Sequence, residues 1–175
     1  AQIVGEITAR TAQLRHFESP DMIARAEAAI AKLKAERKSL DTEIAAIIKS
    51  DADCEQASRI LTSVPGVGTI VAATLLTELP ELGSLNRRQI ASLAGLAPFP
   101  RESGQRKGYR AIRGGRAEVR IALFNAARVA VRHNPKIKTV AERLAAKSKP
   151  YKVIVVAVMR KLLTILNAMI KAQKT

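Results

Sequence analysis

The sequence contains no tryptophan, one cysteine, two tyrosines and three phenylalanines among its 175 residues. Aromatic side chains are enriched in the strands of β-sandwiches and barrels, so their scarcity in a chain rich in alanine and leucine favours packed helices. The lone Cys54 excludes an internal disulfide. Asp51, Asp53 and Glu55 surround it with negative charge, which disfavours the reactive thiolate, so we expect Cys54 to be inert.

Acidic residues become scarce after residue 58. Residues 1–58 hold eight Lys or Arg against ten Asp or Glu, whereas residues 59–175 hold twenty-two against five. Clustered cations bind phosphates with release of counterions, so the second part of the chain is expected to bind a polyanion. Ribosomal and nucleoid proteins share such an excess, and the charge therefore indicates nucleic acid without indicating a function.

The chain also lacks a recognisable signal peptide and a long apolar run. Residues 153–159 are apolar, but this run is too short to span a bilayer and is followed by Arg160 and Lys161. We therefore predict a buried helix face here and no membrane partner.

A heptad pattern runs between residues 21 and 49, after a break at Ser19-Pro20-Asp21 that suits a helix start. Its positions are Ile23, Ala26, Ile30, Leu33, Arg37, Leu40, Ile44 and Ile47. The pattern predicts a coiled-coil rod roughly 40 Å long. The stripe could pair with the preceding helix of the same chain, with a second copy of the chain, or with a helix elsewhere.

The predicted fold is all-α, with a coiled-coil arm over residues 1–58. A compact helical domain follows over residues 59–150, and a C-terminal helix over residues 151–175 packs on it. The helices expected after the arm cover residues 57–63, 69–79, 87–94, 116–133, 135–147 and 151 to the end. Residues 95–115 contain five glycines and two prolines and are expected to form an extended loop or a short ribbon.

Two short helices joined by Pro65-Gly66-Val67-Gly68 resemble the helix-hairpin-helix motif of DNA-binding proteins. Glycines permit the turn and leave backbone amides open to a phosphate at the positive end of the next helix. Val67 is apolar and is expected to pack rather than to contact phosphate. The alternative is a plain tight turn between packed helices.

A basic segment runs from Arg101 to Arg116, with glycines that let a backbone approach a nucleic-acid strand closely. Ser103-Gly104 lies within it, and from the residue types alone Ser103 is a turn serine. The candidate nucleic-acid contacts of the chain are Pro65, Gly66, Val67, Gly68, Gly104, Arg106, Lys107, Arg110, Arg113, Arg116, Lys152 and Arg160.

The succession of motifs over about residues 59–170 resembles the C-terminal domain of the DEDD-type insertion-sequence transposases, which are bridge-RNA-guided serine recombinases. The segments that carry the resemblance are Pro65–Gly68, Ala91–Pro98, Glu102–Gly104, Lys107–Gly108, Arg113–Gly115, Val119–Arg120, Lys152 and Val158–Leu163. The chain departs from the family at Gly114-Gly115, where many members have Gly-Asn.

The resemblance implies that Ser103 attacks a scissile phosphodiester and forms a phosphoserine link to DNA. It also implies an N-terminal RuvC-like domain whose four acidic residues hold a divalent metal, Mg²⁺, that activates the serine. The implied partners are DNA and a guide (bridge) RNA, with a homo-oligomer through the coiled coil, in the bacterial cytoplasm near the nucleoid.

The chain departs from the family in a second respect, because the acidic domain is absent from it. The sequence begins at Ala1, and its acids before residue 59 are spaced as solvated helix positions. Because the resemblance assigns the metal to the acidic domain, we expect no metal site in this chain, and we expect the fragment alone to bind nucleic acid without cutting it. The rival reading is a non-catalytic nucleic-acid-binding and oligomerisation module, and a third is a purely architectural role.

Overall fold

The computed structural model of the chain describes residues 2–99 and 111–173. These residues form eight α-helices, one short 3-10 helix and two strands of two residues each, so the predicted all-α class is confirmed. The chain divides into two compact units, Ala1–Ser50 and Asp51–Thr175. Each unit is described separately below.

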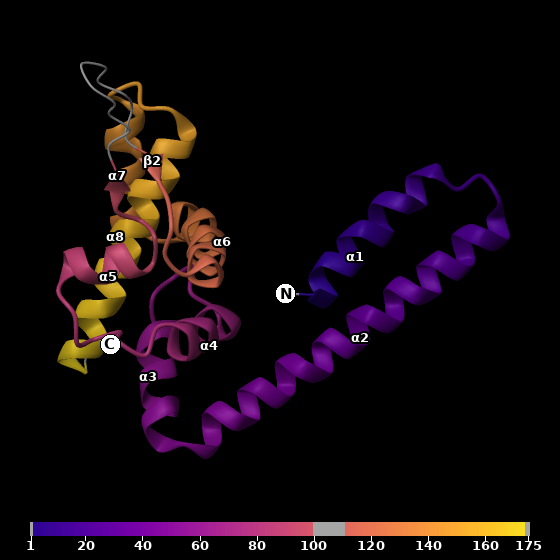
Figure 1. The fold of residues 1–175 in the computed structure, drawn as a ribbon, viewed down its shortest axis with the longest axis horizontal. Coiled ribbons are helices and arrows are strands. Elements are labelled where there is room, and N and C mark those ends of the chain that lie inside the picture. The colour runs from indigo at the N-terminus through magenta and orange to yellow at the C-terminus, as the bar shows by residue number, and fades with distance from the viewer. Residues whose placement is uncertain (1, 100–110, 174–175) are drawn as a thin grey trace. The chain divides into compact units, whose positions relative to one another are not determined.

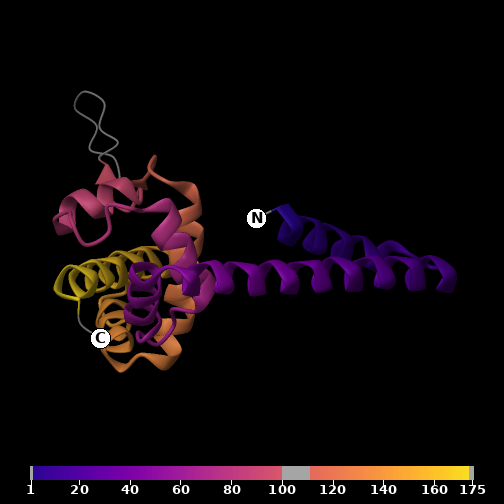
Figure 2. The same ribbon diagram turned by 90° about the horizontal axis from the view of Figure 1, so that it is seen from below.

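The first unit is a helical hairpin. Helix α1 (Gln2–Gln13) leads through η1 (Leu14–His16) into α2 (Pro20–Ser50), which begins at the proline that the sequence indicated. Figure 2 shows α1 lying along the N-terminal part of α2, where Ile30 is buried. The stripe is less well covered further along, since Leu40 is 40% exposed and Ile47 is 69% exposed. Packing of α1 against α2 therefore covers the beginning of the heptad stripe and leaves Leu40 and Ile47 exposed.

The second unit holds the remaining elements. They are α3 (Ala52–Thr62), α4 (Thr69–Glu78), α5 (Arg87–Leu93), β1 (Pro98–Phe99), β2 (Ala111–Ile112), α6 (Ala117–His133), α7 (Pro135–Ala145) and α8 (Tyr151–Ala172). Helix α3 begins earlier than expected because the Asp51 carboxylate accepts a hydrogen bond from the Cys54 amide at 2.9 Å. Helix α3 packs against α4 and α8 and therefore belongs to the second unit. The division between the two units thus follows Ser50, whereas the charge balance of the sequence changes after residue 58.

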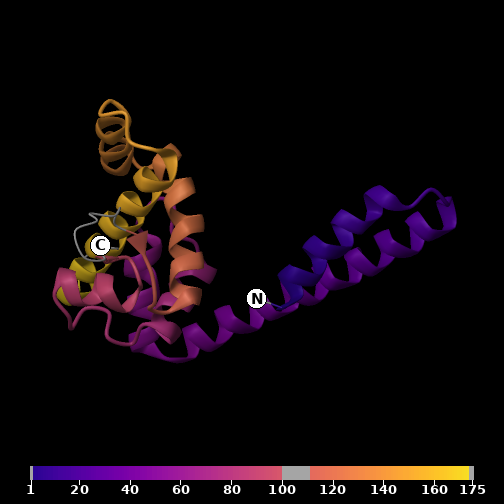
Figure 3. The same cartoon turned by 45° about the horizontal axis from the view of Figure 1, so that its top comes forward.

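Helix α8 forms the centre of this unit. It packs against α3, α5, α6 and α7, and Figures 1 and 3 show it running beside α6. Its buried side chains are Val155, Val158, Met159, Leu162, Leu163, Leu166 and Asn167. The apolar character of residues 153–159 thus reflects burial, as the sequence predicted.

The helix that contains this apolar segment is longer than the segment itself, so the length of residues 153–159 does not decide whether the helix could cross a membrane. Within the described part of the chain, α8 is one helix of 22 residues that is long and apolar enough to cross a membrane by length and composition. The apolar run continues past Arg160 and Lys161, because these two cations interrupt the sequence without ending the helix. The packing of α8 against four other helices is that of a core helix.

Candidate nucleic-acid interface

A short antiparallel ribbon borders the segment that the sequence analysis singled out. Pro98 pairs with Ile112 and Phe99 with Ala111. Residues 100–110 lie outside the described residues, and with them Ser103, Gly104, Arg106, Lys107 and Arg110. Phe99 and Ala111, the described residues that flank this segment in the sequence, are paired with each other.

Two glycine backbones cross closely beneath this ribbon. Gly95 and Gly115 have φ values of +66° and +65°, and a Cβ added to Gly115 would lie 2.6 Å from the Leu93 carbonyl oxygen. The Arg116 amide donates a hydrogen bond to that same oxygen at 2.9 Å. The crossing therefore ties the end of α5 directly to the start of α6, and only glycine leaves room for it.

The arginines beside the ribbon differ in the groups that their guanidinium groups contact. The Arg113 guanidinium lies 5.6 Å from the centre of the exposed Phe99 ring, a cation–π contact that links the two ends of the ribbon. Arg120 instead donates a hydrogen bond to the Gly114 carbonyl oxygen. Arg113 is exposed and is thus the predicted contact residue that the ribbon presents to solvent.

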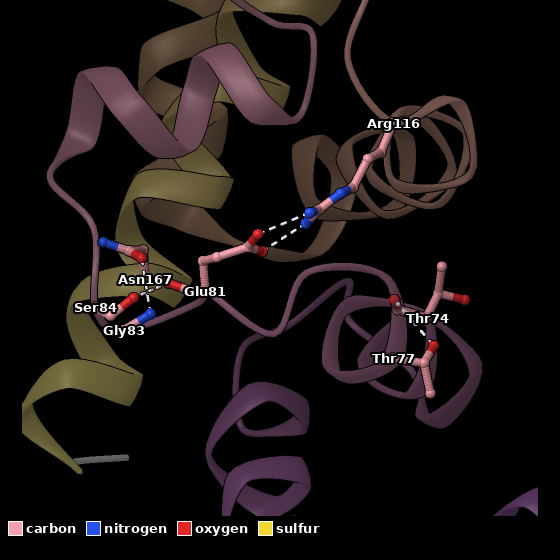
Figure 4. A network of polar contacts seen from close by, with 7 residues as sticks. All are labelled: Thr74, Thr77, Glu81, Gly83, Ser84, Arg116 and Asn167. Carbon is pink, nitrogen blue, oxygen red and sulfur yellow. Dashed lines mark hydrogen bonds and ion pairs between the residues drawn. The ribbon is translucent and has the colours of Figure 1, made fainter.

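Arg116, another predicted contact residue, forms a bidentate ion pair with Glu81 (Figure 4). Its two terminal nitrogens donate to the two Glu81 carboxylate oxygens at 2.5 and 2.7 Å. Its positive charge is therefore balanced within the domain, in contrast to that of Arg113. The ion pair joins the turn after α4 to the start of α6. The buried Asn167 side chain also stabilises this turn. It accepts a hydrogen bond from the Gly83 amide at 2.8 Å and donates one to the Leu85 carbonyl oxygen at 2.9 Å.

The Glu81–Arg116 pair makes the stability of this unit depend on pH. Hydrogen bonds from Arg116 are the largest cause that lowers the pKa of Glu81, from 4.5 to about 2, followed by a backbone hydrogen bond at Glu81. Because the pKa of Glu81 is lower in the folded than in the unfolded state, the ionised carboxylate stabilises the fold fully above the unfolded pKa, and this contribution is lost as pH falls toward the folded pKa of about 2. We expect Glu81→Gln to lower the urea midpoint at pH 7 and to lower it less at pH 3, where part of the contribution has been lost. An equal loss at both pH values would contradict this assignment.

The Pro65-Gly66-Val67-Gly68 turn joins α3 to α4, and its two glycines have different environments. Gly66 has a φ of +105°, and a Cβ there would lie 2.7 Å from both the Cβ and the backbone nitrogen of Ala130 in α6. Val67 is buried beside it. Gly68 is exposed, has no neighbour within 4 Å of a Cβ position, and is the N-cap of α4 without a side-chain hydrogen bond. Of the two glycines of this turn, Gly68 is therefore exposed, whereas Gly66 is half-buried against α6.

The remaining candidates lie on α8. Lys152 is exposed in the first turn, whereas Arg160 is half-buried about 12 Å further along the helix axis. Among residues 2–99 and 111–173, no group of three or more His, Cys, Asp or Glu side chains could hold a metal ion. The described residues therefore offer no donor set for a divalent metal, which the resemblance assigns to a separate RuvC-like domain.

Sequence reasoning missed two residues of this region. Glu81 lies 35 positions before Arg116, and nothing in the local sequence indicates that the two pair. Asn167 could have been noticed, because it is a polar residue on the buried face of an otherwise apolar helix.

Comparison with known proteins places this region in context. Residues 58–142 match the family described as Transposase IS116/IS110/IS902 family. The chain is 31% identical over 138 residues to the insertion element IS110 uncharacterized 43.6 kDa protein of Streptomyces coelicolor, covering 78% of this chain and 33% of that protein. It is 33% identical over 151 residues to the insertion element IS900 uncharacterized 42 kDa protein of Mycobacterium paratuberculosis, covering 81% and 37%. The pilin gene-inverting protein of Moraxella bovis is 32% identical over 139 residues, covering 77% and 43%. The chain thus matches less than half the length of each of these relatives.

Proposed function

Because residues 58–142 match the Transposase IS116/IS110/IS902 family, we propose that this chain binds DNA and supplies the serine nucleophile for strand exchange within a longer recombinase. The observation that carries the proposal is the ribbon: Phe99 pairs with Ala111, and Arg113 stacks on Phe99, at the described positions that flank residues 100–110 in the sequence. Covalent capture of DNA with and without the Ser103 hydroxyl tests the proposal.

The proposed chemistry is nucleophilic substitution at phosphorus. The Ser103 hydroxyl loses its proton, its oxygen bonds to phosphorus, and the phosphodiester bond to the leaving sugar oxygen breaks. That sugar oxygen becomes a hydroxyl group. A phosphoserine bond conserves the energy of the phosphodiester, so a second sugar hydroxyl can reverse the step on a new strand without nucleotide hydrolysis. Arg106, Lys107, Arg110 and Arg113 would neutralise backbone charge around the reacting phosphate.

Two parts of this function would come from outside the chain. A RuvC-like acidic domain would hold Mg²⁺, as the resemblance implies. A guide RNA would select the DNA target by base pairing, so the chain itself would need contacts to the nucleic-acid backbone only. The helix-hairpin-helix at Pro65–Gly68 would add a backbone contact through the open amino end of α4. A bacterial cytoplasmic location follows from this proposal.

We further propose that the arm joins two copies of the chain. Leu40 and Ile47 occupy the heptad stripe and are 40% and 69% exposed, so an apolar seam continues beyond the part that α1 covers. Arg37, in the same stripe, already pairs with Asp41 at 3.7 Å on its own helix. A second copy is the partner that a heptad seam fits best, because it presents the same spacing in return.

A double substitution tests this association. Leu40→Ser with Ile47→Ser is expected to weaken self-association by roughly two orders of magnitude, since each apolar side chain contributes about 1.5 kcal/mol or more when buried. Sedimentation velocity over a concentration series measures the effect. The matched control is Ala31→Ser with Ala46→Ser, two exposed positions of α2 outside the stripe. A wild-type chain that stays monomeric, or a control that dissociates equally, contradicts the proposal.

A further inference from the structure

The end of α6, helix α7 and the start of α8 carry a second concentration of positive charge. Residues 132–152 contain seven Lys or Arg and a single acid, Glu142. The seven cations are Arg132, Lys136, Lys138, Arg143, Lys147, Lys149 and Lys152, and all are exposed. We call this set the basic corner. Within the part of the chain that the structure describes, only Lys138 pairs with an acid, Glu142, at 3.9 Å.

Hydrogen bonds and buried side chains fix the backbone that carries the basic corner. The Asn134 side chain accepts a hydrogen bond from the Ile137 amide and starts α7, whose opposite face buries Ile137 and Ala141. After α7, the amides of Lys147 and Lys149 both donate to the Leu144 carbonyl oxygen at 3.2 Å. The chain reversal that carries these lysines is therefore hydrogen-bonded to the end of the helix.

Three cations of the basic corner form a row. Lys136 and Arg143 are seven residues apart in α7, which places them on the same face and about 10.5 Å apart along the axis. Lys147 lies two residues beyond the end of α7, in the turn that follows the helix. Lys138 and Glu142, which pair with each other, lie on another side of the helix. The cations of the row are thus separated from the acid that could neutralise them.

We propose that the basic corner is a second nucleic-acid surface that binds the phosphodiester backbone through Lys136, Arg143, Lys147, Lys149 and Lys152. Six cations without an acidic partner among the described residues repel one another, and a polyanion relieves this repulsion while its counterions are released. Lysines act as point charges that suit a phosphate backbone, and contacts to phosphates carry no sequence information directly. The inference rests on the proposed function only in that the chain acts on nucleic acid.

The salt dependence of binding tests the basic corner directly. The variant carries Lys136→Gln, Arg143→Gln and Lys147→Gln, and the probes are a 30-bp DNA duplex and an RNA hairpin with a stem of the same sequence. Each lost phosphate contact lowers the slope of log affinity against log salt by about 0.9 for duplex DNA, so we expect a slope smaller by up to about 2.7. Affinity at moderate salt should fall at least tenfold. Anisotropy titrations at several salt concentrations measure both quantities.

Two further variants identify the cause of any change. Lys32→Gln with Lys34→Gln and Lys38→Gln removes the same charge from exposed positions of α2 and should leave the slope unchanged. Lys136→Arg with Arg143→Lys and Lys147→Arg keeps every charge and should keep the slope. Loss in the arm variant equal to that in the basic-corner variant would overturn the inference, because total charge rather than this surface would then govern binding.

The outcomes separate this inference from the proposed function. If the wild-type chain binds with a steep salt dependence and the basic-corner variant matches it on both probes, the basic corner is excluded and the recombinase proposal stands. If the wild-type chain binds neither probe, both fail. A loss restricted to the RNA hairpin supports the basic corner as an RNA-backbone surface, and a loss on both probes supports it as a general phosphate surface.

Discussion

A Ser103→Ala variant of the proposed longer recombinase is expected to form no covalent adduct with DNA. Removing the nucleophile of a covalent mechanism removes the step itself, so the yield of adduct should fall roughly a thousandfold or more. The measurement supplies a guide RNA and a target duplex labelled at each end in turn. Denaturing electrophoresis then shows whether a labelled strand migrates with the protein.

The controls distinguish chemistry from binding. Ser39→Ala changes an exposed serine of α2 whose nearest partner is Glu43 at 3.4 Å, and it should leave the adduct yield unchanged. Ser103→Ala itself should bind the duplex with unchanged affinity and salt dependence, because a hydroxyl carries no charge. Equal adduct formation by Ser103→Ala and wild type would rule out Ser103 as the nucleophile. Absence of any adduct in wild type would favour the non-catalytic binding module.

Several helix boundaries were predictable from local signals. Pro20 begins α2 and Asn134-Pro135 separates α6 from α7, because a proline and an asparagine at a helix start act within one turn. The start of α3 was missed by five residues, although Asp51 is a capping residue of the same kind. The arm was predicted to reach residue 58, where the charge changes, and composition does not report which helices pack together.

Contacts between distant segments were not predictable from one sequence. The Glu81–Arg116 pair spans 35 positions, and it changes the reading of Arg116 from a free cation to one whose charge is balanced inside the domain. The same holds for Asn167, which contacts a turn more than 80 positions earlier in the chain. The local sequence pattern indicates which residues could contact nucleic acid. Tertiary packing decides which of these residues are exposed and which are already paired within the domain.

The two glycines of Pro65-Gly66-Val67-Gly68 are the clearest example, and they lead to the second large prediction. Gly66→Ala is expected to destabilise the domain by roughly 2 to 5 kcal/mol, through a left-handed backbone and overpacking. Gly66 has a φ of +105°, and the new Cβ would lie 2.7 Å from the Ala130 backbone nitrogen. That nitrogen belongs to the backbone of α6, near the end of the helix, so the neighbour cannot rotate away as a side chain would.

Gly68→Ala provides the matched comparison within the same turn. Its φ of −93° suits any residue and no atom lies within 4 Å of the added Cβ, so we expect it to cost less than about 1 kcal/mol. Urea unfolding followed by tyrosine fluorescence reports this domain selectively, because the chain has no tryptophan and its tyrosines, Tyr109 and Tyr151, both follow the arm. If Gly68→Ala keeps the wild-type midpoint yet weakens duplex binding, the open amino end of α4 contacts DNA. If both variants unfold alike and neither alters binding, the motif is a packing turn, and only the cations remain to hold the nucleic acid.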